Sequence, residues 1–196
     1  MDAHGSSSGM LRLARTSFER ALKDWGIQVG FDSTVEDGAA VDALAGEHAE
    51  AASWSDQRYV RISTRVERAA QGTTDFFFPL DVARHLVELI LGEVERGPED
   101  ALSSDELEVF AEMANLFCGS VNAVYDLYGL RLSQDVEHLK VEQGGTGLPA
   151  DLEGHLSRFP YRAPGFPLRE ILQLMPRTLA DQLNGLVQAH PEGDLP

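Results

Sequence analysis

The chain has 196 residues, of which 43% are hydrophobic and 24% are charged, a balance typical of one globular domain rather than of a disordered chain. Its formal net charge of −16 argues against binding to nucleic acid or to anionic lipid, because both need a basic surface. No apolar run has the length of a membrane span, no signal-peptide pattern opens the chain, and the single cysteine allows no internal disulfide, so we expect a cytoplasmic protein.

The first part of the chain predicts a tail followed by a helix. Residues 1–10 are mostly small and polar, and we expect them to form a flexible tail. Apolar residues then recur at helical spacing over 11–25, and Gly26 is expected to end this helix. Residues 27–31 are compatible with a short strand. Residues 34–52 are acidic and rich in Ala, and their pattern assigns no element.

Apolar and polar residues alternate over 58–67, which predicts a half-buried strand. Its polar face carries Arg61 and Arg65. We interpret the arginines Arg58, Arg61, Arg65 and Arg68 as the solvated face of a strand rather than as a basic binding patch. A turn at Gly72 leads to a second strand at Phe76–Phe78, and the two strands read as a hairpin. Pro79 suits the first turn of a helix over 80–95, which Gly97 and Pro98 terminate.

The segment from Ser103 to Asp126 predicts a long amphipathic helix, with Ser103 or Ser104 as its cap. At about 100° per residue, one side is apolar and the opposite side is polar. The apolar side carries Phe110, Met113, Phe117, Val121 and Val124, and the polar side carries Glu108, Glu112, Asn115, Gly119, Asn122 and Asp126. Asn and Gly each cost up to about 1 kcal/mol in the middle of a helix relative to Ala. Solubility alone therefore does not explain why Asn115 and Gly119 occur on this face.

The remaining chain predicts strands over 130–132 and 136–141 and a flexible loop at 144–147. A proline-rich stretch over 160–167 is expected to be extended, and two helices are expected over 168–175 and 178–188. The order of elements predicts an α+β fold, with helices packed on an antiparallel sheet. We therefore predict a domain over 11–147 and a proline-containing helical extension over 148–196 that packs on it.

The motif Glu112-x-x-Asn115 followed by Gly119, placed after a hairpin and another helix, resembles the active-site helix of the CheC/CheX/FliY family. The stretches that carry the resemblance are TTDFFFPLDVARHLVELILGE and ELEVFAEMANLFCGSVNAV, and the resemblance covers about Tyr59 to Val141. The family consists of phosphatases of phosphorylated CheY-type response regulators in bacterial chemotaxis, so the resemblance implies a CheC/CheX-like fold and this activity.

The resemblance also implies a role for each site residue. Glu112 would contact the Lys beside the regulator's phosphoaspartate, and Asn115 would orient the attacking water. Glu108, Gly119 and Asn122 are expected to contact the partner, which is a phosphorylated CheY-like receiver domain. The chain itself is expected to bind no metal or cofactor, because Mg²⁺ belongs to the receiver.

The sequence departs from the family in three respects. Glu108 stands where the family has Asp or Ser, and no proline follows between Asn115 and Pro149. The motif occurs once here, whereas many members carry it twice; its single echo is Asp181-x-x-Asn184, a candidate second site.

Other interpretations stay open at this stage. The Glu112 and Asn115 pair is compatible with an ordinary solvated helix face, and Cys118 is interpreted as a small buried apolar residue rather than a nucleophile. A non-catalytic CheC/FliM-like interaction or scaffold module is the alternative function, with the segment that carries Phe166, Leu168, Ile171, Leu172 and Leu174 as a docking helix. A homodimer with sheets paired across subunits is compatible with either function.

Overall fold

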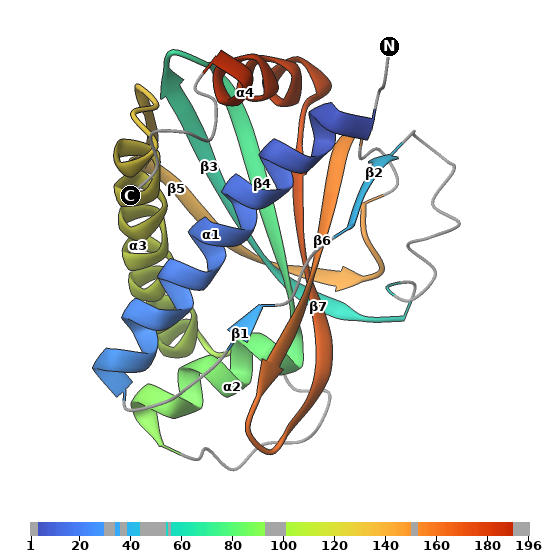
Figure 1. Cartoon of the computed structure of the whole chain (residues 1–196). Coiled ribbons are helices and arrows are strands. Elements are labelled where there is room, and N and C mark those ends of the chain that lie inside the picture. The colour runs from blue at the N-terminus through green and yellow to red at the C-terminus, as the bar shows by residue number, and fades with distance from the viewer. Residues whose placement is uncertain are drawn as a thin grey trace.

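The computed structural model describes residues 4–29, 34–35, 39–43, 54, 56–92, 101–149 and 153–189. Seven strands form one antiparallel sheet in the order β1-β6-β7-β4-β3-β5, with β2 paired to β6 as well (Figure 1). The predicted α+β class, with helices packed on an antiparallel sheet, is therefore confirmed. The elements are α1 (His4–Val29), β1 (Thr34–Val35), β2 (Ala39–Ala43), β3 (Arg58–Arg68), β4 (Gly72–Pro79), α2 (Leu80–Leu91), α3 (Ser104–Leu127), β5 (Leu132–Thr146), β6 (Gly154–Ala163), β7 (Phe166–Met175) and α4 (Arg177–Ala189).

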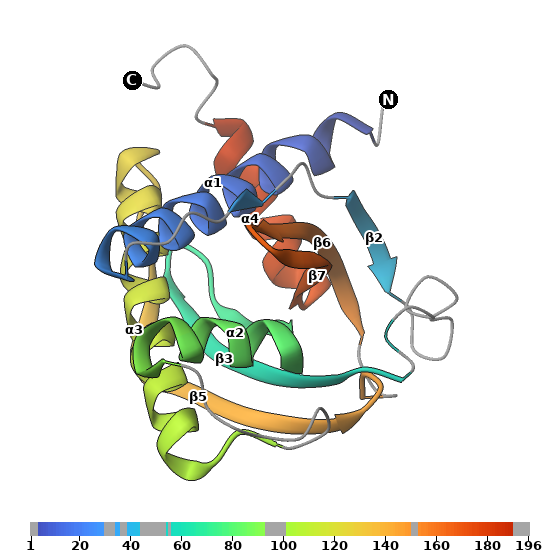
Figure 2. The same ribbon diagram turned by 90° about the horizontal axis from the view of Figure 1, so that it is seen from below.

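The middle of the sheet is buried on both faces, and the run Phe76, Phe77 and Phe78 shows why. Successive residues of a strand point to opposite faces. Phe76 and Phe78 therefore enter the main core under the helices, whereas Phe77 joins a second cluster on the other face with Trp54, Tyr59, Leu156, Leu172 and Leu174. Figure 2 shows α1, α2 and α3 on the same side of the curved sheet.

The predicted hairpin and the helices beside it are confirmed. Strands β3 and β4 pair with Ile62 opposite Phe76, and Pro79 leads directly into α2. Helix α2 ends at Leu91, because Gly92 adopts a φ of 84°, a conformation that glycine tolerates best. The predicted end of this helix at residues 93–95 lies outside the described residues.

The N-terminal helix is longer than its sequence pattern indicates. It begins at His4 and ends at Val29, so residues 4–10 are helical rather than a tail, and residues 27–29 do not form a strand. Tertiary contacts explain the continuation past the predicted stop at Gly26. Trp25 is buried, and its indole N–H donates a hydrogen bond to the backbone oxygen of Met113 on α3 (3.1 Å). A single glycine costs a helix about 1 kcal/mol, which such packing offsets.

The C-terminal part is not an extension, which corrects the predicted domain boundary at residues 147 and 148. Residues 154–175 form β6 and β7, and β7 lies between β6 and β4 inside the sheet. The prediction of a helix over 168–175 is therefore wrong. The hypothesis of a docking helix in this segment is also wrong, because Ile171, Leu172 and Leu174 are buried in the two cores. The predicted helix over 178–188 is confirmed as α4.

Strand β5 is one continuous strand where the pattern predicts two strands and a loop. Its pairing with β3 shifts register between Ser63 and Arg65, so residues 136–139 have no partner residue on β3. The break was predicted at Ser133, Gln134 and Asp135, but these polar residues pair regularly with β3. The glycines predicted to form a flexible loop continue the strand, and Gly144 lies directly against the ring of Tyr59, where a side chain would collide.

Strands β4 and β7 are antiparallel neighbours inside the sheet, and Phe76 of β4 pairs with Gln173 of β7. Each of these strands leads through a proline, Pro79 or Pro176, into a helix. Asp181 and Asn184 lie on α4, a different helix from the one that carries Glu112 and Asn115.

Candidate functional site

Helix α3 is capped by Ser103, one of the two serines predicted as its cap. The Ser103 hydroxyl accepts a hydrogen bond from the Glu106 N–H (3.3 Å), and the Glu106 carboxylate accepts one from the Ser103 N–H (2.8 Å). This capping box satisfies two backbone donors that the first turn leaves open. The five apolar residues predicted to face the core are all buried, so the helix has a defined rotation and its polar side faces outward.

The apolar side of α3 packs into an aromatic cluster. Phe117 lies with its ring centroid 5.0 Å from that of Phe18 on α1 and 4.9 Å from that of Phe76 on β4, both in edge-to-face geometry. Ser120 also donates a hydrogen bond to Asp24 of α1 (2.7 Å). Phe117 and Ser120 therefore attach α3 to α1 at two points. One side of the outer face is therefore bounded by α1.

The opposite flank of α3 is attached to β5 through Asn122. The Asn122 amide donates to the backbone oxygen of Gln134 (3.1 Å) and accepts from the Gln134 N–H (2.6 Å). Asn122 is half-buried, and its side chain connects helix to sheet. A contact between Asn122 and a partner stays a prediction, and the geometry gives this residue a structural role.

We expect Asn122→Ala to lower the free energy of unfolding by about 1–3 kcal/mol, because the buried Gln134 backbone loses both hydrogen bonds. Urea denaturation followed by circular dichroism measures this change. Glu108→Ala, an exposed change on the same helix, is the matched control and should stay within about 0.5 kcal/mol of the wild type. Equal stability of the two variants would contradict the structural role.

Between these two attached flanks the outer face of α3 is exposed. Glu108, Glu112, Asn115 and Gly119 all lie on it with exposed side chains or backbone, and Figure 1 shows α3 at the side of the molecule. Glu112 and Asn115 are one turn apart on this face. A Cβ built on Gly119 meets nothing within 4 Å, so the free chain gives no steric reason for a glycine there.

Two exposed leucines on the same helix were missed by the sequence reasoning. Leu116 is 43% exposed and Leu127 is 54% exposed, and both are among the few large apolar side chains that the described residues leave open. Leu116 follows Asn115 and is one turn after Glu112, so its position on the polar side of the helix was the available signal. The candidate site therefore consists of the polar side chains of Glu112 and Asn115 and the exposed apolar side chain of Leu116 beside them.

Cys118 on α3 is buried. Burial raises the pKa of the Cys118 thiol to about 12, which disfavours a reactive thiolate. Across the part of the chain that the structure describes, no group of three or more His, Cys, Asp or Glu side chains is placed to hold a metal ion. Nor does any described helix have the length and apolarity to cross a membrane.

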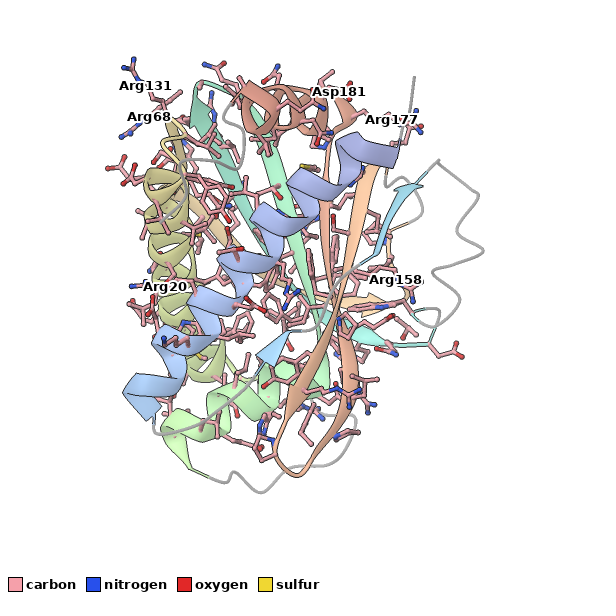
Figure 3. The ribbon with its side chains drawn as sticks, in the orientation of Figure 1. Arg20, Arg68, Arg131, Arg158, Arg177 and Asp181 are labelled. Carbon is pink, nitrogen blue, oxygen red and sulfur yellow. The ribbon has the colours of Figure 1, made fainter. Side chains whose placement is uncertain are left out.

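The arginines of β3 do not form a continuous patch. Arg61 pairs with Glu142 (2.6 Å) and Arg65 with Glu67 (3.4 Å). Arg68 lies beyond them, and Figure 3 shows it projecting outward beside Arg131 near the end of α3. For Arg61 and Arg65, the interpretation as a solvated strand face fits this arrangement.

The arrangement of helices on an antiparallel sheet, with an exposed Glu-x-x-Asn helix, defines a CheC/CheX-like fold. The chain resembles FliY of Thermotoga maritima with a TM-score of 0.74 and 15% sequence identity, over 97% of this chain and 99% of that chain. It resembles CheX of Vibrio vulnificus with a TM-score of 0.59 and 12% identity, over 84% of this chain and 99% of that one. No family model and no curated protein matches the sequence.

The same fold occurs in FliM of H. pylori. FliM in its complex with SpeE matches with a TM-score of 0.60 and 12% identity, over 92% of this chain and 95% of that chain. The protein thus has the fold shared by FliY, CheC-like, CheX and FliM proteins, which confirms the resemblance predicted from its helix motif.

Proposed function

We propose that this protein is a phosphatase that hydrolyses the aspartyl-phosphate of a CheY-like receiver domain in chemotaxis or two-component signalling. The observation that carries the proposal is the exposed pair of Glu112 and Asn115, one turn apart on a helix that is attached on both flanks. A rigid helix presents the two side chains in a constant relation, which positioning catalysis needs. The fold shared with CheX and CheC-like proteins supports the same function.

The proposed chemistry assigns each residue one task. An acyl phosphate is already labile, so hydrolysis mainly requires a water molecule aligned with phosphorus and neutralisation of charge. The Asn115 amide has both a donor and an acceptor and orients the water without adding negative charge. Glu112 binds the receiver's Lys beside the phosphoaspartate, and Gly119 leaves room for the receiver's backbone. Mg²⁺, which neutralises phosphoryl charge, is held by the receiver. Enzyme and substrate would meet in the cytoplasm.

The proposal predicts that adding the purified protein accelerates the loss of phosphate from a phosphorylated receiver. Candidate CheY-type receivers are phosphorylated with labelled acetyl phosphate, freed of excess donor, and followed with and without the protein. The expected result is a rate that rises with protein concentration for at least one receiver. Unchanged phosphate lifetimes for receivers that demonstrably bind the protein would overturn the phosphatase function.

The second candidate function is a non-catalytic interaction module. The similarity to FliM supports it, because that FliM has been solved in complexes with SpeE and with FliG. A module of this kind would bind a chemotaxis or motor partner through the same outer face of α3 and leave the partner's phosphate lifetime unchanged. The assay above separates the two functions. A homodimer through paired edge strands is compatible with both.

A further inference from the structure

The outer face of α3 has opposite charges at its two ends. At the N-terminal end the carboxylates of Asp105, Glu108 and Glu112 are exposed. Just beyond the C-terminal end the guanidinium groups of Arg68 and Arg131 are exposed, and Figure 3 shows them projecting outward beside each other. Within the part of the chain that the structure describes, none of these five side chains forms a hydrogen bond or an ion pair.

Backbone pairing between β3 and β5 fixes the two arginines next to each other. Arg68 lies opposite Leu132, and the Ala69 N–H donates a hydrogen bond to the backbone oxygen of Arg131 (2.9 Å). The chain as a whole carries a net charge of −16, so two neighbouring cations without an internal partner form a local positive site. Such a site is complementary to the carboxylates of another protein surface.

Between the two charged ends, the outer face of α3 is apolar. Leu116 and Leu127 are 43% and 54% exposed, and Gly119 and Ala123 are exposed between them. At about 100° per residue, these four residues fall within about 80° of one another, so they form one strip along the helix. A Cβ built on Gly119 meets nothing within 4 Å, which leaves room for another helix to approach closely.

We propose that two copies of this chain associate through this face, with their α3 helices antiparallel about a twofold axis. A twofold interface needs a self-complementary surface, and this strip has one, acidic at one end and basic at the other. With Gly119 of one copy opposite Ala123 of the other, the axis crosses α3 midway between these residues. Leu116 then lies about 8 Å before the axis and Leu127 about 9 Å after it, so the leucines of the two copies meet. Glu112 lies about 14 Å before the axis, at the level of the second copy's two arginines.

We expect this association to be weak. One helix pair is small compared with the roughly 1,600 Å² that stable protein interfaces bury. Two chains of net charge −16 also repel each other, although at about 0.15 M salt charges more than about 8 Å apart are largely screened. Asp126, an exposed carboxylate near the basic end, opposes the complementarity as well. The dimer covers Glu112 and Asn115 and so competes with a receiver; this consequence rests on the proposed function, whereas the association does not.

The test is sedimentation velocity of the full chain at about 0.15 M salt, over an approximately hundredfold range of protein concentration. The sedimentation coefficient of the wild type should rise with concentration. Arg131→Glu and Glu112→Arg each place like charges opposite each other twice in the symmetric dimer, so each should weaken association about tenfold or more. An equimolar mixture of the two variants should associate like the wild type, because both charge contacts of the mixed dimer again join opposite charges. Asp126→Asn should strengthen association.

Lys140→Glu is the matched control, because it changes the net charge by the same amount at an exposed position of β5, outside α3. Three outcomes would overturn the proposal: a wild type that stays monomeric throughout, equal weakening by Lys140→Glu and Arg131→Glu, and a mixture that does not recover. A variant that failed to fold would not recover on mixing. A monomeric wild type whose binding to a receiver is weakened by Arg131→Glu would assign the arginines to the receiver instead. The sedimentation experiments contain no receiver, so the association and the phosphatase function can fail independently.

Discussion

Asn115→Ala is expected to remove the acceleration of receiver dephosphorylation by about 100-fold or more and to leave the fold intact. The physical reason is that the alanine methyl group cannot hold the attacking water, and a reactant misplaced by about 1 Å commonly loses this much rate. The stability should not fall. Asn115 is exposed in the middle of α3, where Ala is a better helix former than Asn by up to about 0.7 kcal/mol.

The experiment compares phosphate release from the labelled receiver in the presence of wild-type protein and of each variant, with urea denaturation of the same samples. Asn184→Ala is the matched control. It makes the same substitution in the Asp181-x-x-Asn184 sequence of α4, where Asn184 is half-buried, and it should leave the rate unchanged. A wild-type rate for Asn115→Ala would sink the water-positioning mechanism. A rate lost only in Asn184→Ala would move the site to α4.

Gly119→Leu is expected to separate stability from activity. In the free chain a Cβ at this position meets nothing within 4 Å, and the backbone is ordinary helix. Leucine is a much better helix former than glycine, so the substitution should raise the free energy of unfolding by about 0.5–1 kcal/mol. The same side chain would occupy the space beside Asn115 into which the receiver must fit, so the rate of dephosphorylation should fall by tenfold or more, as one lost contact of about 1.4 kcal/mol implies.

The measurement again pairs urea denaturation with phosphate release, and adds receiver binding by titration. Gly185→Leu on α4 is the control, because its Cβ also meets nothing within 4 Å and it lies on another helix. This control should gain stability and keep full activity. A stabilised Gly119→Leu that remains fully active would show that the outer face of α3 is not the docking surface, whatever the function of the protein.

Residues whose structure depends on near neighbours in the chain were predictable. The cap of α3 at Ser103 and the turn that precedes Gly72 act over three or four residues, and the elements that they delimit were found. The rotation of α3 followed from its apolar spacing, which placed Glu112 and Asn115 on the exposed face before any tertiary contact was known.

The C-terminal strands were not predictable in the same way. The pattern of Leu168, Ile171, Leu172 and Leu174 matches a helical face. Residues 171–175 of β7 are nevertheless buried on both faces of the sheet, and a strand segment buried on both faces shows no alternation. Pairing with β4 and β6 decides its structure, and although β6 is its hairpin neighbour, β4 comes from a distant part of the chain. The neighbouring positions of Arg68 and Arg131 were missed for the same reason, because the pairing of β3 with β5 creates them.

The sequence by itself determined the helix that carries the candidate site, its cap, its buried side and the Glu112–Asn115 pair on its outer side. These features depend on the helical repeat and on hydrogen bonds within one or two turns. The tertiary structure alone decided that the last part of the chain completes the sheet, that Asn122 attaches α3 to β5, and that Arg68 and Arg131 lie beside each other near the end of α3. Those outcomes depend on strand pairing and side-chain packing between residues far apart in the chain, where periodicity carries no information.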